Sequence, residues 1–169
     1  MRIKLLLYLV LLSGITLFAQ KPFQLTDSIV KPGQTLTVEL VFDGIRLLNS
    51  EFQFIDSLTQ FLIKNQNLRI EVGCHTDCRD LDEKNLIRST KWARDIKYRL
   101  EDAGIDSSRI ETKGYGESDP IIITEEIHQQ YPFFLLGEKL TETYIDSLKD
   151  KNVREIAHRL NRRTVFKIK

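Results

Sequence analysis

Residues 71–93 constrain the fold of this chain more than any other segment, because they combine three kinds of local structure. The alternation of apolar and charged residues that leads into the segment is typical of a strand. Residues 75–77, His-Thr-Asp, then form a polar loop, and a helix that carries Asn85 and Ser89 on one face is expected after it. The segment therefore predicts that polar groups from a strand end, a loop and a helix point into one cleft.

Strand and helix patterns alternate along the rest of the chain. Period-two alternation predicts strands over residues 35–42, 68–72, 109–113 and 164–169. Helical spacing predicts one helix that ends near Lys64, one that ends at Gly104, and two more within residues 124–160. The length of 169 residues suits one domain. The order strand, helix, strand, helix, strand, helices, strand implies an α/β (α+β) sandwich with helices packed on a sheet.

Capping residues and a buried stripe are expected to define these helices. The expected capping pairs are Ser50 with Gln53, Asp80 with Glu83, and Asn152 with Glu155. The expected buried stripe of the helix after the polar loop consists of Leu86, Ala93, Ile96, Leu100 and Ala103. The polar face beside that stripe would carry Asn85, Arg88, Ser89 and Trp92.

The first residues are typical of a secretory signal peptide over residues 1–19. Positive residues at the start precede an apolar run over residues 5–12, and a small residue, Ala19, stands before a polar one. The apolar run is shorter than the ~20 residues of a membrane span, although a single N-terminal anchor helix is an alternative interpretation. No Cys comes directly after the run, so an acylated N-terminal Cys is not expected. Residues 20–34 are expected to form an extended lead-in.

Export bears on Cys74 and Cys78, the two cysteines of the chain. Outside the reducing cytosol, two cysteines this close in the sequence are candidates for a disulfide. The competing interpretations are two free thiols, or a metal site formed with His75 and Asp77. The sequence offers no second pair of ligands elsewhere, so a structural zinc site is not expected.

The segment and the residues that follow it resemble the OmpA-like (OmpA C-terminal) domain family. In that family a strand leads into Gly-His-Thr-Asp, an Asn follows eight residues after the Asp, and Leu-Ser-x-x-Arg-Ala comes next. Gly-Ile, Gly-x-Gly, Pro and Asn-Arg-Arg come later. The matching residues here are His75, Thr76, Asp77, Asn85, Ser89, Ala93, Gly104, Ile105, Gly114, Gly116, Pro120, Asn161, Arg162 and Arg163. The resemblance covers about residues 35–169 and implies a four-stranded mixed sheet, with an extra helical insertion over about residues 124–160 before the last strand.

The resemblance also implies a function, because members of the family bind peptidoglycan without catalysis. In the family an Asp and an Arg together grip the diaminopimelate side chain. Asp77 matches the Asp, Trp92 stands where the Arg is expected, and Arg88, one turn earlier on the same helix face, is our candidate replacement. The expected ligand-binding residues are Thr76, Asp77, Asn85, Arg88, Ser89 and Arg162. Such a protein would lie in the periplasm, or at the periplasmic face of the outer membrane, of a Gram-negative bacterium.

Other function classes fit the sequence less well. A formal net charge of +1 leaves no broad basic field, so nucleic acid is not an expected partner. Cys74, His75 and Asp77 lie on one extended segment whose side chains alternate between faces, so they are not expected to form a catalytic relay. We expect no enzyme activity, no cofactor and no metal. The alternative function is a degenerate OmpA-like fold that binds an envelope protein through residues 124–160, with the membrane contacted only indirectly.

Overall fold

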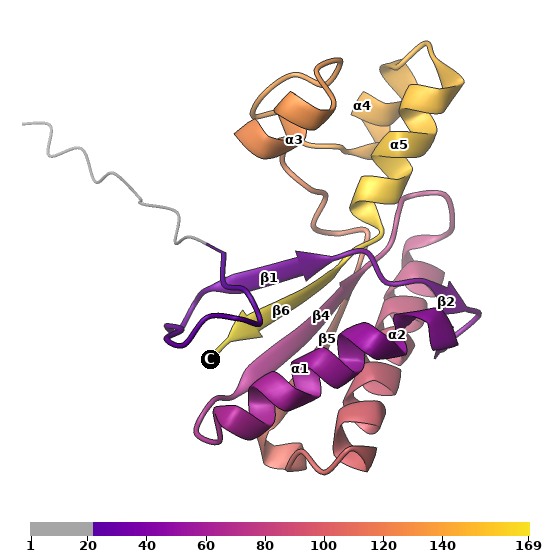
Figure 1. Cartoon of the computed structure of the whole chain (residues 1–169). Helices are drawn as coiled ribbons and strands as arrows, with labels where there is room; N and C mark the ends of the chain where they lie inside the picture. Colours follow the sequence, from indigo (N-terminus) through magenta and orange to yellow (C-terminus); the bar gives the residue numbers. More distant parts are fainter. Residues whose placement is uncertain (1–21) are drawn as a thin grey trace, which may run out of the picture.

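The computed structural model describes residues 22–169, and Figure 1 shows how their helices and strands are arranged. Four strands form one sheet in the order β1-β6-β4-β5. Their bounds are Thr35–Val38 (β1), Ile70–His75 (β4), Ile110–Gly116 (β5) and Thr164–Ile168 (β6). β4 pairs with β5 in parallel, whereas β6 is antiparallel to both β1 and β4. The prediction of a four-stranded mixed sheet is therefore confirmed.

The strand predicted over residues 35–42 is shorter than expected. β1 ends at Val38, and the chain then forms a separate two-stranded hairpin of β2 (Phe42–Asp43) and β3 (Arg46–Leu47). Gly44, with a φ of 60°, sits in the turn of this hairpin, where a residue without Cβ avoids backbone strain. The hairpin lies against the helix α2 (Asp82–Asp102), where the N–H of Leu47 donates to Oδ2 of Asp95 at 2.9 Å.

Two long helices, α1 (Phe52–Lys64) and α2 (Asp82–Asp102), cover one face of the sheet (Figure 1). α2 is the crossover that joins the parallel strands β4 and β5. The core between helices and sheet includes Leu58, Leu62, Ile70, Val72, Ile96, Leu100, Phe166 and Ile168, all of them buried. This apolar layer holds the carboxyl end of β4 at a fixed place beside the start of α2.

The buried stripe of α2 differs from the predicted stripe at both ends. Its three central residues are buried as predicted, whereas Leu86 is half exposed and Ala103 is exposed. The stripe continues instead through Ser89 and Asn85, which keep the helical spacing and are buried. The first turns of α2 therefore place an amide and a hydroxyl group in the interior, facing the loop that follows β4.

The three predicted capping pairs are wrong. α1 follows a short 3-10 turn and α2 begins after Leu81, and neither helix has a side-chain cap. The last helix, α5 (Lys151–Asn161), is capped by Asp150, whose carboxylate accepts hydrogen bonds from two backbone N–H groups of the first turn. Asp80 does not cap α2, which begins after Leu81, and its carboxylate accepts a hydrogen bond from Arg88 at 2.7 Å.

Three helices between β5 and β6 form a lobe beyond the carboxyl ends of the parallel strands (Figure 1). They are α3 (Glu125–Gln130), α4 (Glu142–Ser147) and α5, and α3 has no counterpart among the predicted helices. The lobe has its own core of Ile123, Phe134, Leu140, Ile145 and Ala157. The buried Asn161 side chain accepts from the N–H of Ile121 at 3.0 Å and donates to the carbonyl of Leu140 at 2.8 Å. Its last helix leads directly into β6.

Residues 22–34 are the described part of the predicted lead-in, and the signal peptide predicted over residues 1–19 lies outside the described residues. Phe23 is fully buried, and its ring stacks on Phe61 with the ring centroids 5.6 Å apart. The N–H of Phe23 donates to the carbonyl of Thr35 at 3.1 Å. A buried aromatic ring and a backbone hydrogen bond therefore attach the lead-in to α1 and to β1.

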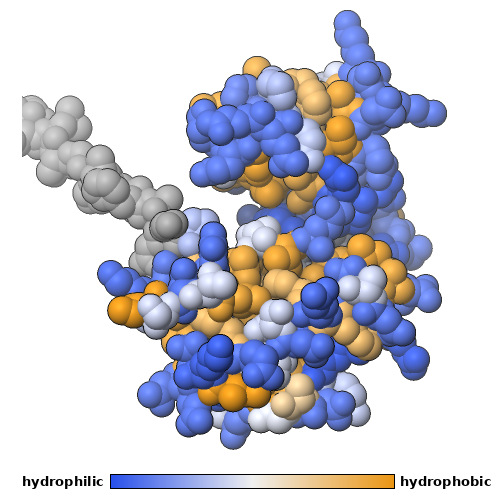
Figure 2. Space-filling model, viewed as in Figure 1, coloured by the Kyte–Doolittle hydropathy of each residue, from blue (hydrophilic) through white to orange (hydrophobic). Residues whose placement is uncertain are grey.

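The surface has a hollow between the helical lobe and the sheet, which Figure 2 shows. This groove has a volume of about 670 Å³, and its walls include Thr37 of β1, Val165 of β6 and Leu160 of α5. In the part of the chain that the structure describes, no helix combines the length and the apolar character that crossing a bilayer requires.

Candidate ligand-binding site

The loop after β4 holds Thr76 and Asp77 at the end of the sheet that faces the helical lobe, and both residues are buried. The N–H of Thr76 donates to the carbonyl of Gly116 at 2.8 Å, and the N–H of His75 donates to that of Arg163 at 2.9 Å. These bonds fasten the loop to the ends of β5 and β6. The loop thus lies where the parallel strands end, which is the usual place for a ligand site on such a sheet.

Asn85 and Ser89 hold this loop from the side of α2. The amide of Asn85 donates to the carbonyls of Asp77, at 3.0 Å, and Asp80, at 3.2 Å. The hydroxyl of Ser89 accepts from the N–H of Gly116 at 2.9 Å. Both side chains are buried and are engaged by the loop and by β5. They therefore hold the loop of Asp77 in place from the side of α2.

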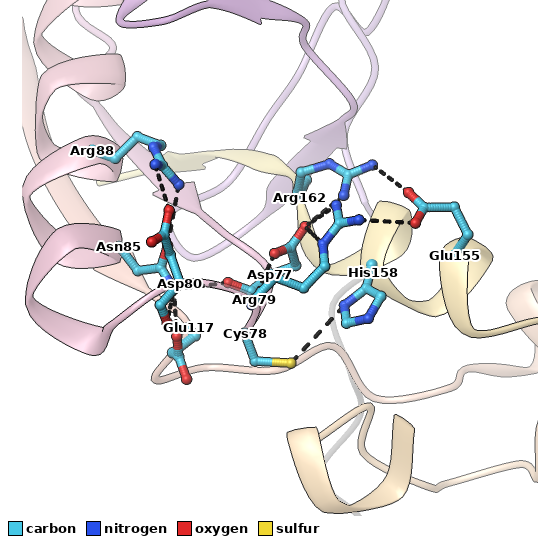
Figure 3. Close-up of polar contacts among 10 residues, drawn as sticks. All are labelled: Asp77, Cys78, Arg79, Asp80, Asn85, Arg88, Glu117, Glu155, His158 and Arg162. Atoms are coloured by element: carbon cyan, nitrogen blue, oxygen red, sulfur yellow. Dashed lines mark hydrogen bonds and ion pairs between the residues drawn. The ribbon is translucent and has the colours of Figure 1, made fainter. Parts of the chain in front are cut away.

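The carboxylate of Asp77 belongs to a closed ring of four charged side chains (Figure 3). Its Oδ2 accepts from Nη2 of Arg79 at 2.7 Å and from Nη1 of Arg162 at 2.5 Å. Glu155 of α5 completes the ring, with its carboxylate oxygens 2.9 Å from Nη1 of Arg79 and 3.5 Å from Nη2 of Arg162. Carboxylates and guanidinium groups alternate around the ring, so their formal charges cancel.

The carboxyl group of Asp77 is ionised at physiological pH. Burial by itself raises its pKa, but hydrogen bonds from Arg79 and Arg162 outweigh burial and lower the pKa to about 2. The backbone N–H of Arg79 donates a further hydrogen bond to Oδ1 at 3.1 Å. A fixed negative charge of this kind suits the cationic group of a ligand, provided that an arginine gives way.

Arg88, the predicted replacement for the family arginine, lines the same cavity as Asp77, Arg79 and Arg162. The cavity has a volume of about 400 Å³. The guanidinium group of Arg88 forms an ion pair with Asp80 at 2.7 Å, on the wall of this cavity. Arg88 thus lies on the wall of the cavity that holds Asp77, and its part in ligand binding stays a prediction.

Trp92 stands at the position of the family arginine and forms a wall of the cavity. Its Nε1 donates to the carbonyl of Gly44 at 2.8 Å, and its ring stacks on Phe42 with the centroids 4.7 Å apart. The same two rings line an adjoining cavity of about 250 Å³, together with His75 and Arg162. The β2–β3 hairpin and α2 thus build an aromatic wall that borders both cavities.

The candidate disulfide between Cys74 and Cys78 is not formed, and both cysteines are free thiols, which is one of the alternatives that the sequence left open. Sγ of Cys74 lies 3.6 Å from Oγ1 of Thr164, whereas Sγ of Cys78 lies 4.0 Å from Nδ1 of His158. Burial raises the pKa of the Cys74 thiol to about 12 and that of Cys78 to about 11, so both are protonated at neutral pH. Within residues 22–169, no three or more His, Cys, Asp or Glu side chains cluster so that they could hold a metal ion.

His75 is buried at the end of β4, and its ring stacks on Tyr115 with the centroids 4.5 Å apart. Burial lowers the pKa of its imidazole to about 4, with help from the positive charge of Arg163 and against the opposing charge of Asp119. Its Nδ1 lies 3.9 Å from the carboxylate of Asp119. His75 is therefore neutral at physiological pH and acts as a packing residue.

The neutral state of His75 predicts that acid weakens the fold. In the unfolded chain the histidine takes up a proton near its ordinary pKa of ~6.5, whereas the folded protein resists protonation down to about 4. We expect the free energy of unfolding to fall by roughly 1–2 kcal/mol between pH 7 and pH 5. Urea unfolding at several pH values in this range should show this fall of the unfolding free energy in the wild type. Most of the fall should be lost in His75→Gln.

The control for this experiment is His158→Gln. Burial lowers the pKa of His158 as well, but this residue is less buried than His75, so its loss should remove a smaller part of the slope. An unchanged slope in His75→Gln would contradict the assignment.

The sequence did not predict Arg79 and Glu155 as residues of the site. A signal for Arg79 exists, because it follows Asp77 by two residues in the same loop and an arginine there is well placed to pair with the carboxylate. No such signal exists for Glu155, which contacts Arg79 across 76 residues of sequence. The resemblance alone suggested Arg162, and the structure places it on Asp77.

Comparison with known proteins gives one family match and one related sequence. The model of the family described as "OmpA family" matches residues 41–131. The peptidoglycan-associated lipoprotein of Buchnera aphidicola subsp. Baizongia pistaciae (strain Bp) is 29% identical over 107 residues, which are 63% of this chain. The match spans 61% of that lipoprotein, less than two thirds of its length.

Solved structures share the fold. The peptidoglycan-associated lipoprotein from Burkholderia pseudomallei superposes with a TM-score of 0.55 at 17% identity, covering 79% of this chain and 89% of that chain. The periplasmic domain of Helicobacter pylori MotB superposes with a TM-score of 0.55 at 13% identity, covering 83% of this chain and 78% of that chain. At these identities the likeness concerns the mixed sheet and its helices.

Proposed function

The chain belongs to the OmpA family, and from this premise we propose that it binds peptidoglycan, without catalysis, through the diaminopimelate side chain. The observation that carries the proposal is the ionised Asp77 at the carboxyl end of β4, surrounded by guanidinium groups. Diaminopimelate ends in an ammonium and a carboxylate on one carbon atom. The carboxylate of Asp77 complements the ammonium, and the guanidinium groups complement the carboxylate. Both contacts would be charge-assisted hydrogen bonds, which are stronger than neutral ones.

The residues that line the cavity have distinct roles in this proposal. Asp77 accepts the ammonium of the ligand, while Arg79, Arg162 and Arg88 donate to the carboxylate of the ligand. Trp92 and Phe42 lie against the aliphatic part of the side chain. Thr76, whose buried hydroxyl has no hydrogen-bond partner among the described residues, adds a polar group beside Asp77.

Binding of this kind would tether the protein to the cell wall, or let it sense the wall. The related Buchnera protein is named a peptidoglycan-associated lipoprotein, which supports this proposal. The signal peptide predicted over residues 1–19 would direct the protein to the periplasm. The protein would then act in the periplasm or at the periplasmic face of the outer membrane.

Co-sedimentation with purified cell walls tests the proposal. The protein should pellet with diaminopimelate-type peptidoglycan and pellet much less with lysine-type peptidoglycan, whose lysine side chain ends in an ammonium without the carboxylate. Equal pelleting with both walls would contradict recognition of diaminopimelate. No pelleting with either wall would contradict peptidoglycan binding itself.

One observation favours a second candidate function, the binding of an envelope protein by the helical lobe. The loop between α3 and α4 exposes three large apolar side chains, with Phe133 46%, Leu135 65% and Leu136 56% exposed. Neighbouring exposed apolar side chains are typical of protein contact surfaces. If the protein does not pellet with either wall, this loop becomes the leading site, and charged substitutions at Leu135 and Leu136 should then abolish association with the partner.

A further inference from the structure

The ring around Asp77 joins two separate parts of the molecule. Asp77 and Arg79 belong to the loop after β4, whereas Glu155 lies on α5 of the helical lobe and Arg162 directly follows that helix (Figure 3). Glu155 is the member that the lobe adds from within a helix. A ligand that enters the site therefore meets a carboxylate supplied by the lobe.

Within the ring, Glu155 contacts the two arginines as the carboxylate of a ligand would. Its two oxygens are shared between Arg79, at 2.9 Å, and Arg162, at 3.5 Å, and both arginines also donate to Asp77. A carboxylate that bridges two guanidinium groups next to an aspartate is the arrangement that the acidic end of an amino acid would adopt at this site.

The members of the ring are held with different strength. The side chain of Asp77 is 11% exposed, while those of Arg79 and Glu155 are 49% and 57% exposed. Exposed ion pairs contribute little because water screens them, whereas the buried carboxylate keeps its partners. The contacts of Glu155 are therefore the ones that exchange most easily, and Asp77 stays in place as the fixed point of the site.

We propose that Glu155 competes with the carboxylate of the ligand for Arg79 and Arg162, so that the helical lobe sets the affinity and the specificity of the site. This inference rests on the proposed binding of diaminopimelate. An ammonium alone does not displace Glu155, because it has nothing to offer the two arginines in exchange. A zwitterionic head group can do both: its carboxylate replaces that of Glu155, and its ammonium replaces one of the two arginines at Asp77. The ring therefore favours a zwitterionic ligand over a ligand that carries an ammonium alone.

Calorimetric titration with a soluble disaccharide-tripeptide that ends in meso-diaminopimelate tests this inference. Glu155→Gln keeps the shape of the side chain and removes its charge, and the residue is exposed, so the variant should fold. We expect it to bind the muropeptide about two- to tenfold more tightly than the wild type, since two exposed ion pairs no longer have to be given up. The matched control is Glu125→Gln on α3, which makes the same charge change on the same lobe and should leave the affinity unchanged.

Each outcome decides the matter. Equal or weaker binding by Glu155→Gln, with clear binding by the wild type, would overturn the competition and leave the proposed function intact. Tightening by the same factor in Glu125→Gln would assign the effect to overall charge and would also overturn it. No binding by any of the three proteins would refute the proposed function, and the inference with it. Tightening in Glu155→Gln alone supports both.

Discussion

Replacing Asp77 by asparagine is expected to weaken binding to diaminopimelate-type peptidoglycan by roughly ten- to a hundredfold, because a hydrogen bond to a charged partner contributes ~1.5–3 kcal/mol. The substitution keeps the shape of the side chain and removes the charge that would hold the ammonium of the ligand. It also removes the acceptor shared by Arg79 and Arg162, leaving Glu155 as their common partner. Quantitative pelleting with isolated cell walls measures the loss.

The control for Asp77→Asn is Asp56→Asn, which makes the same charge change on the exposed face of α1. Thermal melting of both variants shows whether the fold is retained. Wall affinity that is unchanged in a folded Asp77→Asn protein would remove the central residue from the site. The pKa of Asp77 lies at about 2, so the carboxylate itself should cause no change in wild-type binding between pH 5 and pH 8.

Arg88→Ala in the same assay tests whether Arg88, besides Arg162 and Arg79, donates to the carboxylate of the ligand. Arg88 lines the cavity but pairs with Asp80, so we expect its loss to cost less than the loss of Asp77. Lys84→Ala is the matched control, because Lys84 also pairs with Asp80, at 3.9 Å, without lining the cavity. Unchanged affinity in Arg88→Ala would rule out the relocated arginine and leave Arg162 and Arg79 as the donors.

The overall fold could be predicted because it depends on periodicity. The alternation of apolar and polar residues predicted all four strands of the sheet, and helical spacing predicted the central residues of the α2 stripe. The prediction of the buried stripe was wrong at its N-terminal end, because Leu86 is apolar and was expected to be buried. The loop that packs against this end is polar, and it is matched better by the amide of Asn85 and the hydroxyl of Ser89. Whether a residue is buried depends on how well its side chain matches the groups it faces, and periodicity does not describe those groups.

The candidate site could be predicted in part. The loop residues and Arg88 follow from the order of the chain and from helical geometry. The absence of a bond between the two cysteines could not be predicted this way, because spacing says nothing of side-chain direction: Cys74 points into the core and Cys78 toward the lobe. The ring around Asp77 depends on Glu155, which the fold brings from a distant helix. Long-range ion pairs of this kind leave no local pattern in a single sequence.

Gly114→Ala is expected to lower the free energy of unfolding by about 3 kcal/mol, at the upper end of the usual cost of overpacking. Gly114 lies where β5 passes close to α2. A Cβ added there would lie 2.3 Å from Oγ1, 2.4 Å from N and 2.7 Å from Cα of Thr90. Two of these three atoms are backbone, so the clash cannot be relieved by a rotation of the Thr90 side chain. The helix itself must move away from the strand. Urea unfolding measures the loss.

Gly73→Ala is the matched control, on the neighbouring strand β4. There the nearest atom to an added Cβ is Cε2 of Tyr115, at 2.9 Å, and a side chain can shift where a helix backbone cannot. Gly73→Ala should therefore cost clearly less than Gly114→Ala, and an equal cost would contradict the close approach of α2 and β5. Because α2 also carries Asn85 and Ser89, its displacement should loosen the loop of Asp77. Gly114→Ala is thus expected to weaken wall binding even where the protein remains folded.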